Sequence, residues 1–252
     1  MTYEELIKGE KRLHRDIAQI AKRFLDAYNP YSSKGVLELS FERFFSGTPK
    51  SLGVDDIWRF SNTLMVHHYH NEAFVKYRLI QSELSKSKAV SAFEIPVGDS
   101  RADLCRVNGH SYCYEIKTAF DKLDRLEKQL EDYLSVFEFV YVVCPDERVM
   151  EILPTLPKEV GIISYDDHRT NPGFITRKKA SLSSSICPEK QIQALSLPLD
   201  KTKGAAGINS LFKAKFKTKY QENWKFLVGH MNDLLPLDYQ WAFKNKLLPL
   251  RR

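Results

Sequence analysis

The sequence predicts an α/β protein with a mixed central sheet, and three observations support this prediction. Segments with strand-like composition occupy residues 89–96, 101–107 and 110–118. A helical pattern of apolar residues follows over 121–137, and a run of β-branched and aromatic residues over 138–144 has the composition of a strand buried on both faces. This order predicts three antiparallel strands, then a crossover helix that leads to a parallel strand.

Helical additions are expected before this core. An amphipathic pattern opens the chain and ends near Pro30, and a second helical pattern runs from about Asp56 to Leu84. Between them lies a connecting stretch with Gly35, Gly47 and further turn-forming residues.

Beyond the core the signals weaken. A short helix is expected around residues 149–153, and strands are expected at 160–165 and within 174–182. A polar stretch leads to residues 209–235. We interpret this segment as one long helix, because its pattern of apolar residues continues well beyond the length of an average strand. The same segment alternates with lysines, so a strand with a lysine face stays open as the alternative.

These patterns predict three regions. Residues 1–66 form an N-terminal helical region, residues 67–182 form the core, and residues 183–252 form a linker and a basic helical C-terminal region.

Composition limits the classes of protein to consider. With 252 residues, 43% of them hydrophobic, the chain can bury an ordinary core. No apolar run approaches the ~20 residues of a membrane span, and no secretion signal is visible, so no membrane partner and a cytoplasmic location are expected. The four cysteines form no CxxC pair, which argues against a zinc or iron–sulfur site.

The net charge of +6 is unevenly distributed. Residues 201–252 contain eleven Lys and Arg against three Asp and Glu, a balance of +8, whereas residues 1–200 have a balance of −2. A basic segment favours a polyanionic partner such as nucleic acid. A solvated lysine face is the competing interpretation.

Two acids and a lysine in neighbouring predicted strands form the candidate site. Asp103 lies in the second strand, and Glu115 and Lys117 lie two residues apart in the third, so the latter two share one face. Opposed carboxylates repel each other, and a hard divalent cation such as Mg²⁺ or Mn²⁺ would remove that repulsion.

Whether Asp103 joins that face depends on the hairpin at Asn108-Gly109. A two-residue turn would send Glu115 to the opposite face from Asp103. A three-residue loop with a left-handed Gly109, or a bulge elsewhere, would set Asp103 opposite Glu115. The site hypothesis requires one of these two irregularities.

The pattern resembles the PD-(D/E)xK nuclease superfamily, particularly its RecB-like branch. The residues that support this resemblance are Asp103, then Glu115-Ile116-Lys117, then a helix with Gln129 and Tyr133, then the buried strand, together covering about residues 67 to 145. The proline of the family name is absent before Asp103, where the sequence reads Ser100-Arg101-Ala102.

The resemblance implies a restriction-endonuclease-like core and a metal-dependent nuclease that hydrolyses DNA, with RNA as a second substrate class. Asp103 and Glu115 would hold Mg²⁺ or Mn²⁺, with Ile116 as a further ligand position, and Lys117 would assist the attacking water. Three more catalytic positions and four nucleic-acid contacts are expected: Glu72, Gln129 and Tyr133 for catalysis, and Arg101, Arg125, Lys213 and Lys217 for phosphates.

Two further possibilities remain open. Glu94 is either a third ligand or a satisfied surface acid, and the second interpretation is favoured. The whole chain could also be a catalytically silent module on the same fold that binds nucleic acid or protein, alone, as an oligomer or with an accessory protein.

Overall fold

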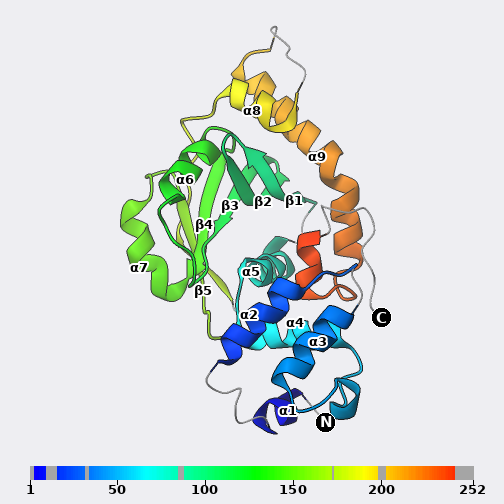
Figure 1. The fold of residues 1–252 in the computed structure, drawn as a ribbon. Helices are drawn as coiled ribbons and strands as arrows, with labels where there is room; N and C mark the ends of the chain where they lie inside the picture. Colours follow the sequence, from blue (N-terminus) through cyan, green and yellow to red (C-terminus); the bar gives the residue numbers. More distant parts are fainter. Residues whose placement is uncertain are drawn as a thin grey trace. The chain divides into compact units, whose positions relative to one another are not determined.

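The computed structural model describes residues 3–9, 16–31, 34–84, 88–171, 173–197 and 203–241. The chain forms two compact units (Figure 1). The helical unit comprises Met1–Tyr77 and His230–Arg252, and the sheet unit comprises Arg78–Gly229. These divisions differ from the predicted boundaries after residues 66 and 182, because α9 (Ala205–Gly229) packs against strands of the core instead of forming a separate region.

An aromatic core organises the helical unit. The rings of Phe24, Phe41 and Phe45 all pack against Phe60, with centroids 5.1–5.8 Å from it. The C-terminal segment joins this unit through a hydrogen bond of 2.8 Å from the Leu237 N–H to Asn62. The helices are α1 (Tyr3–Gly9), α2 (Ile17–Ala27), α3 (Gly35–Phe44), α4 (Ile57–His68), the greater part of α5 (Glu72–Leu79), and 3-10 turns at Lys50–Leu52 and Pro236–Trp241.

Two expectations for this unit were wrong. The predicted connecting stretch contains α3, whose exposed Val36 and Leu39 obscure the apolar stripe formed by the buried Leu37 and Phe41. The predicted helix from Asp56 to Leu84 is also broken, because the backbone of Tyr69 leaves the helical conformation, with φ −151° and ψ 89°, and the side chain of Asn71 accepts the N–H of Phe74. A π-helical turn, Ile80–Leu84, follows α5.

The sheet unit contains a six-stranded mixed sheet in sequential order, which confirms the predicted fold class at this level. The first three strands pair antiparallel, the third to fifth pair parallel, and the last pairs antiparallel. The strands are β1 (Val90–Val97), β2 (Ser100–Asn108), β3 (His110–Ile116), β4 (Phe139–Pro145), β5 (Gly161–Tyr165) and β6 (Phe174–Lys178).

Helices complete the sheet unit (Figure 1). The crossover helix α6 (Leu126–Leu134) joins β3 to β4, and α7 (Val149–Ile152) and α8 (Pro188–Leu195) follow later in the chain. Helix α9 confirms the helical interpretation of the lysine-rich segment, because its stripe of Ile208, Phe212, Phe216, Trp224 and Leu227 is buried. Within the described residues no helix is both long and apolar enough to span a bilayer.

The β2–β3 hairpin has the three-residue loop on which the site hypothesis depends. Val107 pairs with Ser111, Cys105 pairs with Cys113, and Gly109 has a left-handed φ of 74°. Glycine adopts this conformation without the steric cost that a Cβ would add.

The β1–β2 hairpin places an additional acid beside Asp103. Phe93 pairs with Leu104 and Ile95 pairs with Ala102, so Glu94 lies opposite Asp103. Glu94 has a φ of 57°, the left-handed region that side chains rarely adopt. A strand therefore holds this glutamate in a strained conformation.

Replacing Glu94 tests that strain directly. We expect Glu94→Gly to be more stable than Glu94→Ala by about 1 kcal/mol, since only glycine adopts a left-handed φ at little cost. Both variants lose the same carboxylate, so urea unfolding of the pair isolates the backbone effect. An alanine variant as stable as the glycine variant would contradict the strain.

A buried carboxylate, Glu138, ties α9 to the hairpin. It accepts the N–H of Ser111 at 2.6 Å, and its oxygens lie 3.1 and 3.2 Å from the ammonium of Lys213. His110 and Asn209 contact the same carboxylate. Lys213 therefore has a structural role that the sequence analysis, which expected a phosphate contact, did not anticipate.

The ionisation of Glu138 follows from these contacts. Burial favours the neutral acid, but the hydrogen bonds from Ser111, His110, Lys213 and Asn209 outweigh it and lower the pKa of Glu138 to about 2. The ionised form therefore stabilises the fold fully above the ordinary pKa of 4.5, and this stabilisation is lost as the pH falls toward 2.

Acid unfolding provides the corresponding test. At pH 7 we expect Glu138→Gln to lower the free energy of unfolding by about 1–3 kcal/mol, because charged hydrogen bonds to a buried group are lost. At pH 3 the difference between variant and wild type should shrink. Glu222→Gln, at an exposed position of α9, should change stability at neither pH. A Glu138→Gln effect as large at pH 3 as at pH 7 would disprove the assignment.

Candidate active site

Asp103, Glu115 and Lys117 lie on one face of the sheet, as the site hypothesis requires. The observed register, continued by one residue, sets Asp103 opposite Glu115, and Lys117 follows two residues later. The regular pairing of β2 with β3 extends only to Leu104 and Tyr114. Beyond this pair, the carboxylate of Asp103 accepts the N–H of Ile116 at 2.7 Å. A side chain therefore replaces the main-chain acceptor where the pairing of the two strands ends.

The crossover helix supplies the partners of Glu115 and Lys117. The ammonium of Lys117 donates to Glu115 Oε1 at 2.7 Å and to Gln129 Oε1 at 2.9 Å. The hydroxyl of Tyr133 lies 2.9 Å from Glu115 Oε2. Gln129 and Tyr133 are four residues apart on α6 and therefore reach the same place. The structure brings together all five of these predicted residues.

The hydroxyl of Tyr133 is a permanent donor in this cluster. It also lies 2.9 Å from the carbonyl oxygen of Arg101, and its single proton can serve one of the two acceptors at a time. Burial, followed by the charge of Glu115, raises the pKa of Tyr133 far above its ordinary value. The phenol therefore stays protonated and holds Glu115 in place.

The three charged side chains of this cluster are almost completely buried. Asp103, Glu115 and Lys117 expose 8%, 2% and 8% of their surface, respectively. A buried carboxylate is tolerated when it is ion-paired and hydrogen-bonded, and each oxygen of Glu115 contacts a donor. Such a buried charged cluster is a frequent property of functional sites.

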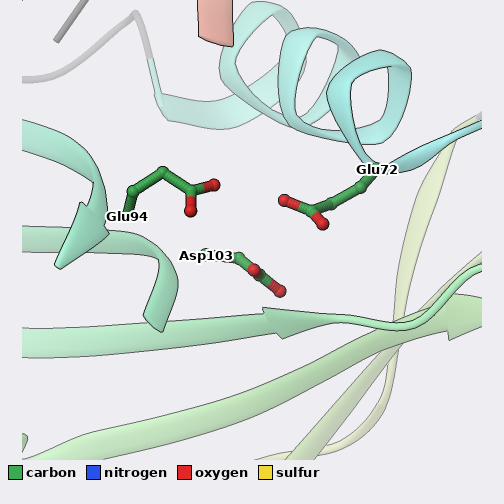
Figure 2. Close-up of side chains that lie close together, drawn as sticks. All are labelled: Glu72, Glu94 and Asp103. Atoms are coloured by element: carbon green, nitrogen blue, oxygen red, sulfur yellow. The ribbon is translucent and has the colours of Figure 1, made fainter. Parts of the chain in front are cut away.

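Glu94 brings a second carboxylate to Asp103. A carboxylate oxygen of Glu94 lies within 4.8 Å of one of Asp103. Figure 2 shows the two side chains, which come from neighbouring strands and extend to the same side. Mg²⁺ binds carboxylate oxygens at about 2.0–2.1 Å, so neighbouring ligand oxygens are about 3–4 Å apart. Small rotations of the two side chains would bring their oxygens to this separation. Carboxylate oxygens are also the hard donors that Mg²⁺ prefers.

Glu94 and its partner Arg101 are more exposed to solvent than Asp103. The Glu94 side chain is 22% exposed and pairs at 2.5 Å with Arg101, whose side chain is 70% exposed. The sequence analysis favoured a surface role for Glu94. The two-residue Gly98-Asp99 turn is the feature of the sequence that sets Glu94 opposite Asp103.

The remaining predicted residues lie in several places. Ile116 is buried, and its N–H contacts Asp103, so only its carbonyl oxygen could ligate a metal. Arg125 is exposed just before α6, and Lys217 is partly exposed on α9. Glu72 is the first residue of α5, belongs to the helical unit and pairs with Lys76.

Known proteins provide three comparisons. Residues 65–219 match the family described as Bacteriophage P4 protein cII. Protein cII of Enterobacteria phage P4 is 27% identical over 114 residues, which cover 45% of this chain and 43% of the phage protein. The match thus spans less than half of the length of that curated relative.

A solved structure, the SPO1766 protein of unknown function from Silicibacter pomeroyi, is 16% identical with a TM-score of 0.38, covering 56% of this chain and 81% of that one.

The family match includes α6 and every strand of the sheet. It extends over more than half of the chain, which therefore belongs to the family of bacteriophage P4 protein cII.

Proposed function

We propose that this chain is a metal-dependent nuclease that hydrolyses phosphodiester bonds of DNA, with RNA as a second substrate class. The observation that supports it best is the placement of Asp103, Glu115 and Lys117 on one face, with Gln129 and Tyr133 closing on them from the crossover helix. This arrangement is the one expected for a PD-(D/E)xK superfamily member with a restriction-endonuclease-like core.

Asp103 and Glu94 are the residues best placed to hold Mg²⁺ or Mn²⁺, and Glu115 follows on the same face. When bound, the ion would polarise the scissile phosphate and lower the pKa of an attacking water. The Ile116 N–H orients the Asp103 carboxylate for this task.

The other residues position charge around the reacting phosphate. Lys117 provides an ammonium that can orient the water or neutralise charge that develops on the phosphate. Gln129 and Glu115 hold that ammonium, and Tyr133 holds Glu115. Arg101 and Arg125, both exposed, are suited to contact neighbouring phosphates.

A cleavage assay tests this proposal. The purified chain should cut labelled single-stranded, double-stranded or branched DNA with Mg²⁺ or Mn²⁺ and should be inactive in EDTA. Asp103→Asn and Lys117→Met should each reduce the rate at least about 100-fold, because each removes a charge from the transition state.

Glu222→Gln, which alters an exposed carboxylate of α9 in the same unit, is the matched control and should keep full activity. Binding of DNA without cleavage under any metal would favour the catalytically silent module instead.

Metal binding can be measured apart from turnover. Calorimetric titration of the wild type with Mn²⁺ should give a binding isotherm, and both Asp103→Asn and Glu94→Gln should weaken it at least about tenfold, since each removes a charged ligand. Binding unchanged in Asp103→Asn would overturn the metal assignment.

A further inference from the structure

We propose that the loop from Thr118 to Arg125, here called the site loop, presents Phe120 as a stacking platform for an unpaired nucleobase. The substrate would then be single-stranded nucleic acid or a single-stranded end. This inference rests on the proposed nuclease function and adds the substrate class to it. The sequence predicts a helix from residue 121 onward, but α6 begins only at Leu126.

The site loop starts directly at the candidate site. Phe120 is three residues after Lys117, so their backbones are at most about 11 Å apart. A nucleobase that contacts Phe120 therefore belongs to a nucleotide close to a phosphate bound at the candidate site.

Hydrogen bonds within the site loop give it a defined shape. The N–H and the hydroxyl of Thr118 both donate to the carboxylate of Asp121 at 2.7 Å. The N–H of Phe120 in turn donates to the Thr118 hydroxyl at 3.3 Å. These bonds form a tight turn with Phe120 at its tip.

Arg148, which immediately precedes α7, stabilises the site loop through hydrogen bonds to its main chain. Its guanidinium donates to the carbonyl oxygens of Thr118 and Asp121, both at 2.7 Å. The Arg148 side chain is only 13% exposed and also pairs with Glu151. The site loop is therefore held by the core of the sheet unit, which lowers the entropy that it would lose on binding.

The side chain at the tip is apolar and open to solvent. Phe120 is 58% exposed, although it is held on an ordered turn. Exposed apolar surface is unfavourable in water, and stacking of a ring on a base contributes about 1–3 kcal/mol. Lys122 and Arg125, exposed on the same loop, provide cations for the adjoining phosphates.

This geometry favours an unpaired base over a duplex. Inside a duplex each base is stacked on both faces and its ring is inaccessible to an outside side chain. An unpaired base exposes its face, and every base type can stack, so the platform selects for strandedness and not for sequence.

Fluorescence anisotropy of the full chain in EDTA tests the platform without catalysis. A labelled single-stranded oligonucleotide should bind more tightly than the matching duplex. Phe120→Ala should weaken single-strand binding about 5- to 150-fold, the equivalent of one lost stacking contact, and should change duplex binding less than about twofold. Phe120→Trp should retain single-strand affinity.

Met150→Ala is the matched control, because Met150 is 78% exposed in the same unit and should leave both affinities unchanged. Equal single-strand affinity in wild type and Phe120→Ala, or preferential duplex binding by the wild type, would overturn the platform.

Different outcomes would disprove the nuclease proposal and the stacking platform. A chain that binds single strands through Phe120 but cuts no nucleic acid with any metal would keep the platform and lose the nuclease. A chain whose metal-dependent cleavage is the same in Phe120→Ala on every substrate would keep the nuclease and lose the platform.

Discussion

The register between β2 and β3 is the constraint on which the candidate site depends. A shift of one residue would turn Glu115 and Lys117 to the opposite face and leave Asp103 alone. The left-handed Gly109 prevents this shift, because it allows a three-residue turn that pairs Val107 with Ser111. A glycine six residues from Asp103 therefore decides which side chains can act together.

Three energetically unfavourable features meet at this end of the sheet. Glu115 and Lys117 are charged and buried, Glu94 adopts a strained backbone conformation, and the carboxylates of Glu94 and Asp103 lie close together. Each lowers stability unless the surroundings compensate. Gln129 and Tyr133 compensate for Glu115 and Lys117, Arg101 pairs with Glu94, and the Ile116 N–H donates to Asp103. Strained backbone and clustered charge of this kind are frequent at functional sites.

The strands could be predicted because their signals are local. Alternation, β-branched runs and the Asn-Gly turn lie within a few residues, and they identified the first four strands and the mixed sheet. The features that the sequence does not reveal involve long-range packing. The compact units differ from the predicted regions because α9 packs on β1 and β2. The contact of Lys213 with Glu138 joins residues 75 positions apart, so no local signal indicates it. The position of Glu94 opposite Asp103 depends on a second register, that of β1 with β2.

The charge of the C-terminal segment shows why a charge count is weak support for a nucleic-acid surface. Among the lysines of α9, Lys213 neutralises the buried Glu138, Lys225 pairs with Glu222, and Lys219 lies over the ring of Tyr220. Part of the positive balance therefore stabilises the fold and its surface, and it contributes less to phosphate binding than the formal charge suggests. The functional proposal consequently depends on the geometry around Asp103 and Lys117, where an exposed aromatic ring and two exposed cations lie within a few residues of a buried charged cluster.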